Sequence, residues 1–330
     1  MTSPQHIIIN HSGFHPAMRH GMEKLGIIFD QNTWKPTAQQ MKPTVACHIW
    51  FYECIRHPFK IWRLKRRLSR YNIPLIAWNR DAPHYLNHTK PQRRWILNLA
   101  NWLRLLDIYA THTLIDEHRT FANLVLFLPN AADSSRYTIG NDPSERLLKL
   151  RNSEDYRWDV TFFGGMNGSK YKEDKSREAF FKELGKRLEE LNITYCFREA
   201  DGMSSEDQIH FIQASRINLN FGARCEYGAS IASGLPERCY GIPACGGFLL
   251  CDKRTHARDD FTPGENWAEY DGLDDCVEKI QYWLAHFDKA RDLAERCHTH
   301  VLNNHTYAHR AEKLLNAIHA WHAGARGLIK

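Results

Sequence analysis

The chain has 330 residues, of which 43% are hydrophobic and 25% charged, and its formal net charge is +6. This length suits two domains, the composition is that of a globular protein, and no apolar run is long enough to cross a bilayer. The first residues do not form a secretory signal, and the nine cysteines include no CxxC pair. We expect a cytoplasmic protein with neither a disulfide framework nor a structural zinc.

Short apolar runs alternate with polar or helical stretches in the first half of the chain. A helix is predicted at 17–25, and strands are predicted at 6–10, 45–50, 75–78, 108–111 and 125–128. This alternation is typical of a parallel sheet with helices on both faces. The polar segment 133–157 contains Gly-Asn-Asp-Pro and is the best candidate for a connection between two lobes.

Residues 56–70, RHPFKIWRLKRRLSR, are rich in lysine and arginine and contain no acid. Their apolar residues approximate one face of a helix. We favour the interpretation that this face packs on the protein's own sheet and that the cations are solvated. The alternative is contact with an anionic membrane surface or with a nucleic-acid backbone.

The same pattern restarts after residue 157. Helices are predicted at 176–191 and 235–244, and strands at 159–163, 194–197, 217–221 and 248–251. We therefore predict an α/β protein with two Rossmann-like domains, 1–150 and 151–305, which face each other across a cleft. The amphipathic C-terminal segment, 306–330, is predicted to be a helix that packs back toward the first domain.

The stretch WDVTFFGGMNGSK, residues 158–170, combines a strand, a Gly164-Gly165 loop and a polar tail that ends in Lys170. Glycines let a backbone approach a phosphate closely, and free N–H groups and cations neutralise its charge. The signal alone is weak, because a Gly-Gly after a strand is as often a plain turn. Neither GxGxxG nor GxxxxGK[ST] is present, so a dinucleotide site or a P-loop is not supported.

A more specific signal lies at 217–252, INLNFGARCEYGASIASGLPERCYGIPACGGFLLCD, followed by FTPGENWAEYDGLDD and NNHTYAHRAEKLL. These motifs resemble the C-terminal lobe of GT-B glycosyltransferases, in particular the spore-maturation (CgeB-like) group, over about residues 158–318. LIAWNRDAPHYL and LVLFLPNAADSSRY resemble the first lobe more loosely. The resemblance implies a nucleotide-sugar donor held mainly by the second lobe, an acceptor held by the first, and catalysis without a metal or other cofactor.

Without a metal, the leaving diphosphate of such a donor requires Arg or Lys side chains and helix N-termini. Arg238 is the first candidate, because it lies near the start of the helix predicted at 235–244. Glycines on two loops would let the backbone pass close to the donor. The candidate donor-binding residues are Gly164, Gly165, Lys170, Arg224, Glu237, Arg238, Gly246 and Gly247, with Lys172 as a further secondary cation.

One position departs from the resemblance. The related helix usually carries a Glu three residues after the Arg, where it binds the ribose hydroxyls, and here that position is Gly241. Glu237, about one helical turn away, is either a substitute or a charge favoured by the helix dipole. The donor is then bound differently, or the nucleotide is unusual, or the lobe has lost donor binding.

An inverting transfer needs a general base with a pKa near neutrality, which favours a histidine or a carboxylate. The candidates are Asp81 and His84 in NRDAPHYL, and His15 and His20 after the first strand. A retaining enzyme would need none of them. A further cluster of histidines near the C-terminus is better explained as an exposed, polar helix start with Thr306 as N-cap than as a metal site. The cluster contains His298, His300, His305 and His309.

The predicted function is transfer of a sugar from a nucleotide-sugar donor to a bacterial surface glycan or a lipid-linked saccharide. The basic stretch 56–70 would then lie at the inner face of the membrane. Two alternatives remain open. One is a glycosyltransferase that acts on modified bases of a nucleic acid, and the other, motivated by Gly241, is a catalytically silent protein that binds a partner.

Overall fold

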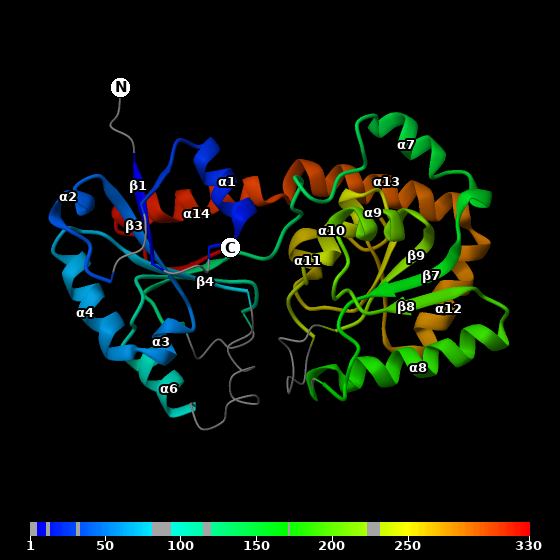
Figure 1. Cartoon of the computed structure of the whole chain (residues 1–330), viewed down its shortest axis with the longest axis horizontal. Coiled ribbons are helices and arrows are strands. Elements are labelled where there is room, and N and C mark those ends of the chain that lie inside the picture. Colours follow the sequence, from blue (N-terminus) through cyan, green and yellow to red (C-terminus); the bar gives the residue numbers. More distant parts are fainter. Residues whose placement is uncertain are drawn as a thin grey trace. The chain divides into compact units, whose positions relative to one another are not determined.

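The computed structural model describes residues 5–10, 14–30, 34–80, 94–114, 120–170, 172–222 and 232–330. The chain forms two compact units (Figure 1). Unit 1 contains Met1–Asn130 and Tyr307–Lys330, and unit 2 contains Ala131–Thr306. Each unit is built on its own sheet, and all strand pairs in both sheets are parallel. The predicted fold class, α/β with two Rossmann-like units, is confirmed.

Unit 1 has a seven-stranded sheet in the order β12-β6-β5-β4-β3-β1-β2. Its strands are short and apolar, as expected for a parallel sheet that is covered on both faces. The strands are β1 His6–Asn10, β2 Ile28–Asp30, β3 Thr44–Trp50, β4 Leu75–Asn79, β5 Ile108–Thr111, β6 Leu124–Phe127 and β12 Gly327–Ile329. All strands predicted in this half of the chain are present.

Two groups of helices cover this sheet. The helices α3 (Glu53–Arg56), α4 (Pro58–Ser69) and α6 (Arg94–Trp102) contribute to one hydrophobic core. The helix α1 (Pro16–Lys24) packs against α14 (Tyr307–His322), and Gly21 permits their close approach because a Cβ there would lie 2.9 Å from the Cβ of Ala311. A short helix, α2, spans Ala38–Met41. The C-terminal helix is therefore an integral part of unit 1.

Unit 2 has a five-stranded sheet in the order β11-β10-β9-β7-β8. Its strands are β7 Trp158–Phe163, β8 Tyr195–Arg198, β9 Ser215–Asn220, β10 Leu249–Asp252 and β11 Ala268–Tyr270. Its α-helices are α7 Pro143–Lys149, α8 Lys175–Glu190, α9 Ser205–Gln213, α10 Arg238–Ala244, α11 Ala257–Asp260, α12 Gly272–Ala285 and α13 Phe287–Asn304. Two hydrophobic clusters pack on this sheet, one with α9 and α10 and one with α8 and α12.

The polar segment 133–157 is packed on unit 2. Tyr137, Ile139 and Leu150 are its buried anchors, and the side chains of Ile139 and Leu150 lie against Gly246. By its contacts, unit 2 thus begins at Ala131, whereas the sequence-based division was placed after residue 150. The reason is that three scattered apolar residues in a polar stretch are enough to bind it to a core. Among the helices of the described residues, none is long and apolar enough to span a membrane.

Candidate functional site

The carboxyl edge of the sheet in unit 2 is the first place to look for a ligand. In this sheet β8 is the neighbour of β7 on one side. The next strand along the chain, β9, is its neighbour on the other side. Open α/β sheets bind ligands outside the carboxyl ends of the strands, at the point where the strand order reverses. Here that point lies between β7 and β9, and the loops that begin at Gly164 and Phe221 flank it.

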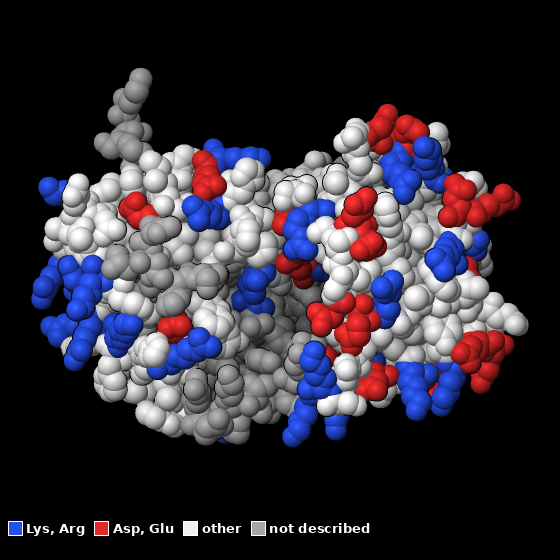
Figure 2. All heavy atoms as spheres, viewed as in Figure 1, with Lys and Arg blue, Asp and Glu red and all other residues white. Residues whose placement is uncertain are grey.

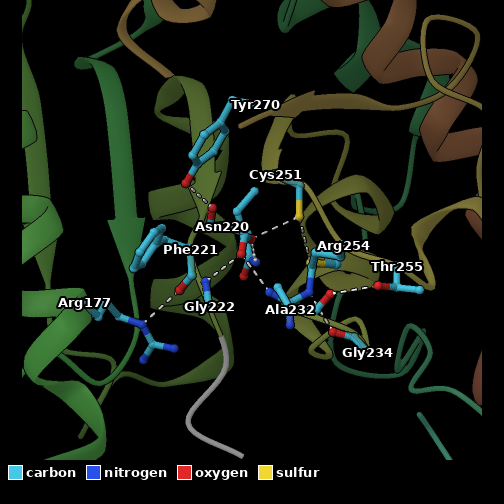
Figure 3. Close-up of polar contacts among 12 residues, drawn as sticks. Arg177, Asn220, Phe221, Gly222, Ala232, Gly234, Cys251, Arg254, Thr255 and Tyr270 are labelled. Atoms are coloured by element: carbon cyan, nitrogen blue, oxygen red, sulfur yellow. Dashed lines mark hydrogen bonds and ion pairs between the residues drawn. The ribbon is translucent and has the colours of Figure 1, made fainter. Parts of the chain in front are cut away.

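Arg177, in the first turn of α8, joins these two loops. Its Nη1 donates to the carbonyl oxygen of Gly165 at 2.7 Å, and its Nε donates to that of Phe221 at 3.0 Å. The side chain is buried, and its Nη1 lies 3.6 Å from a carboxylate oxygen of the buried Asp174. The close-up in Figure 3 shows Arg177 directed at Phe221. Because one guanidinium binds both loops, their spacing at the switch point is fixed.

Arg238 is the first residue of α10, and its guanidinium lies against the loop after β7. Its Nη1 donates to the carbonyl oxygen of Phe163 at 2.8 Å, and its Cζ is 5.0 Å from the ring centroid of Phe162. A side chain at Gly164 would collide with this guanidinium. The structure thus brings Gly164 and Arg238, two of the predicted residues, into contact.

The guanidinium of Arg238 is only partly paired within the part of the chain that the structure describes. Among the described residues, no carboxylate forms an ion pair with it, and its buried Nε has no hydrogen-bond partner. Burial lowers the pKa of Arg238, because a charged guanidinium is disfavoured away from water. A bound anion would offset this cost, since charge-assisted hydrogen bonds to phosphate are among the strongest in proteins.

A polar network centred on Asp252 lies at the ends of β9 and β10. Figure 3 shows its partners Asn220, Gly222 and Arg254. One carboxylate oxygen of Asp252 accepts from Asn220 Nδ2 at 2.5 Å. The other accepts from the Gly222 N–H at 2.9 Å and from Arg254 Nη1 at 2.8 Å. Arg254 Nε in turn donates to the carbonyl oxygen of Gly234 at 2.7 Å. The network therefore holds Gly222 and Gly234, on either side of residues 223–231.

Sequence reasoning did not single out this network or the role of Arg177. The available signal was the polar residue that ends each apolar strand, namely Asn220 in β9 and Asp252 in β10. In a parallel sheet such residues meet at one edge. Arg224, a predicted secondary cation, lies outside the described residues.

The other predicted donor residues fall into two groups. Lys170 and Lys172 are exposed in the connection between β7 and α8, and Glu237 is half-buried immediately before α10. Gly246 and Gly247 follow the end of α10 and precede β10, so they lie at the amino edge of the sheet, opposite Arg238. Side chains placed there would meet Ile139 and Ile212, respectively. This geometry gives the two glycines a packing role in place of the expected donor contact.

The space beside Gly241 is filled by Tyr137. A Cβ at Gly241 would lie 3.3 Å from the ring of Tyr137, whose hydroxyl donates to Gln208 Oε1 at 2.6 Å. Burial and, to a smaller extent, the negative charge of Glu237 raise the pKa of Tyr137 to about 12. Glu237 is therefore close enough to act electrostatically on this tyrosine. An aromatic ring and a nearby carboxylate stand where the resemblance places a single glutamate.

The predicted base candidates belong to unit 1. His15 lies directly before α1, where its ring stacks on Tyr307 with the centroids 4.2 Å apart and meets the edge of Trp78 at 6.3 Å. His20 is exposed on α1. Asp81 and His84 lie outside the described residues.

The histidines near the C-terminus differ from expectation. His298 and His305 are 5% and 8% exposed, respectively, so the prediction that the cluster is exposed was wrong for both. His298 Nδ1 is 2.9 Å from the carbonyl oxygen of Pro243, and the Nε2 atoms of His300 and His305 are 3.0 Å apart. These side chains contact α10 and one another because the end of α13 packs against α10, which local sequence does not reveal.

Comparison with known proteins agrees with the fold. In solved structures, sucrose-phosphate synthase from Thermosynechococcus elongatus is similar over 97% of this chain and 100% of its own, with 10% identity and a TM-score of 0.61. Trehalose 6-phosphate synthase from Burkholderia multivorans matches 98% of this chain and 99% of its own, with 8% identity and a TM-score of 0.57. HepE from Anabaena, solved in complex with UDP, matches 96% of this chain and 100% of its own, with 12% identity and a TM-score of 0.53.

These likenesses show that the fold is the GT-B fold of glycosyltransferases. No curated protein matches the sequence. A model of the family described as glycosyl transferase-like matches residues 151–316, which include β7 to β11 and all the residues placed at the carboxyl edge of unit 2. The chain therefore belongs to the glycosyl transferase-like family.

Proposed function

We propose that this protein transfers a glycosyl group from a nucleotide-sugar donor that binds at the carboxyl edge of the sheet in unit 2. The observation that carries the proposal is Arg238, a cation beside the Gly164 loop that has no carboxylate partner among the described residues. The family match covers this edge. HepE was solved with UDP and with UDP-glucose, so a uridine nucleotide is the first donor to test.

The chemistry follows from the charges. When the glycosidic bond to the diphosphate breaks, negative charge develops on the leaving oxygen, and a preorganised cation lowers the energy of that state. We assign this role to Arg238, which contacts the Gly164 loop, and we assign a positioning role to Arg177, which binds the loops on both sides. We propose that these cations, helped by Lys170, Lys172 and Arg224, replace a metal. Activity that persists in excess EDTA would agree with this, and activity that EDTA abolishes would contradict it.

The acceptor is proposed to bind to unit 1, with a bacterial surface glycan or a lipid-linked saccharide as its class. His15, Asp81 and His84 are the proposed bases for an inverting transfer. His15 follows β1 and lies against Tyr307 and Trp78, so it is held at the carboxyl edge of the sheet in unit 1. A cytoplasmic protein at the inner face of the membrane would meet such acceptors.

The decisive experiment is a thermal-shift panel with UDP, GDP, ADP, CMP and TDP. A ligand that binds only the folded state raises its stability by about 2.7 kcal/mol at one hundred times its dissociation constant. We expect one nucleotide to raise the melting temperature of the wild type and of the control Arg187→Ala, an arginine of unit 2 with a 42% exposed side chain. We expect the shift to disappear in Arg238→Ala and to return in part in Arg238→Lys.

A second candidate function is favoured by the Tyr137 ring at Gly241. If this ring has replaced the ribose contact altogether, the protein is a silent member of its family that binds a partner. No shift with any nucleotide or UDP-sugar at millimolar concentration would favour this alternative, and a shift that is lost in Arg238→Ala would exclude it.

A further inference from the structure

The helix α4 of unit 1 carries a cluster of cations, most of which form no ion pair with the described residues. Lys65 has partners within unit 1, because its Nζ lies 3.0 Å from Asp107 Oδ1 and donates to the carbonyl oxygens of Arg104 and Leu106. The other cations of α4 and its C-cap are Lys60, Arg63, Arg66, Arg67 and Arg70. They form no ion pair with the described residues, and all except Arg67 are exposed. Figure 2 shows blue side chains gathered over α4 at the left of the view.

Exposed aromatic side chains accompany these cations. On α4, Phe59 is 72% and Trp62 is 40% exposed, and on α6 Trp95 is 64% and Trp102 is 77% exposed. They are surplus to the core, because Ile61, Leu64 and Leu68 of α4 and Leu97 and Ala100 of α6 already fill it. The bonds from Lys65 to Arg104 and Leu106 hold α4 against the chain just after α6. We call the surface made by these cations and aromatic residues the α4–α6 face.

An open groove beside α4 is lined by several of these cations. Its lining includes Trp34, Lys35, Arg56, Lys60, Arg63 and Arg67. The Nζ of Lys60 lies 3.9 Å from the ring centroid of Trp34, and Arg66 Cζ lies 4.8 Å from that of Trp62. Cations and aromatic rings are thus interleaved along the helix.

Large aromatic residues and cations on the exposed sides of α4 and α6 match the chemistry of a lipid bilayer interface. Tryptophan and phenylalanine partition into the headgroup region, while arginine and lysine bind anionic headgroups. A nucleic-acid duplex would bind the cations, but its backbone offers no partner for apolar side chains as exposed as Phe59 and Trp102. We propose that the α4–α6 face docks the protein on a membrane surface that contains anionic lipids, with the aromatic side chains inserted at the interface.

The test is sedimentation of the full chain with phosphatidylcholine vesicles that contain or lack phosphatidylglycerol. A basic residue at such a surface contributes a factor of about five to partitioning, so Arg63→Gln/Arg66→Gln/Arg70→Gln should bind anionic vesicles about a hundredfold less. The control Lys182→Gln/Lys279→Gln/Lys289→Gln removes the same charge from exposed positions of unit 2 and should retain binding. An equal loss in both variants would show that net charge alone acts and would overturn the proposal.

A second pair of variants tests insertion. Phe59→Ser should reduce vesicle binding several-fold, whereas Leu148→Ser, at a position of unit 2 that is 70% exposed, should not. If the wild type does not sediment with anionic vesicles, the membrane proposal is wrong. It is also wrong if the same arginines bind a single-stranded RNA or a duplex DNA while the protein does not bind vesicles.

Binding to vesicles and binding of the nucleotide can be lost independently of each other. The arginines changed here belong to unit 1, and the donor site belongs to unit 2, so the triple variant should keep the wild-type nucleotide shift and melting temperature. A vesicle defect with a normal nucleotide shift supports the membrane surface whatever the acceptor is.

Discussion

Replacement of Asp252 by asparagine tests whether the network at the carboxyl edge of unit 2 stabilises the fold. Asp252 accepts hydrogen bonds from Asn220, from the Gly222 N–H and from Arg254, which is 1% exposed. Asparagine preserves the size of the side chain, but it removes the charge and turns one acceptor into a donor. Loss of one partner from a buried ion pair costs about 3–5 kcal/mol. Since whole domains are stable by only about 5–15 kcal/mol, this is a severe loss.

The assay is urea unfolding followed by circular dichroism, with the free energy of unfolding as the measured quantity. The matched control is Asp271→Asn, because Asp271 is 74% exposed and its ion pair with Lys253, at 3.2 Å, should contribute at most about 1 kcal/mol. Asp252→Asn combined with Arg254→Met should recover part of the loss, because it also removes the buried cation. If Asp252→Asn costs no more than the control, the network does not stabilise unit 2 and the reasoning is refuted.

Three further changes test packing and burial. Gly246 has a φ of +76°, and a Cβ there would lie 2.7 Å from Ile139 Cδ1. Gly246→Ala should therefore lower the free energy of unfolding, measured by urea titration, by about 1–3 kcal/mol. An unchanged free energy of unfolding would contradict the packing role. Gly241→Glu should lower the melting temperature, because its side chain meets the Tyr137 ring, and Tyr137→Ala in the same chain should relieve the clash; a stable single variant would contradict this. Burial lowers the pKa of His48 from 6.5 to about 3, so the unfolded chain binds a proton first as the pH falls. Stability should therefore be level above about pH 6.5 and fall by about 2 kcal/mol between pH 7 and pH 5, and His48→Leu should remove that part of the fall in urea titrations at the two pH values.

The secondary structure could be predicted closely from local pattern. The runs at 75–78 and 108–111 are β4 and β5 with almost the same bounds, because a strand buried on both faces must be apolar at every position. The unit to which the segment 133–157 belongs was harder to predict. Its polar residues indicated a connection, but burial of Tyr137 and Leu150 binds it to unit 2. Burial depends on what packs against a residue, which periodicity in a short window cannot show.

The candidate site was predicted in part. The sequence by itself determined that Gly164 follows a strand and that Arg238 lies near the start of a helix, and a parallel sheet then places such positions at its carboxyl edge. Only the tertiary structure decided that the strand order reverses between β7 and β9, that Arg177 joins the two loops there, and that Gly246 faces Ile139 at the other edge. It alone also placed the Tyr137 ring on Gly241. The physical reason is that local pattern fixes which backbone conformation a segment adopts, whereas contacts between distant segments depend on the order of the strands and on the shapes of the side chains that meet.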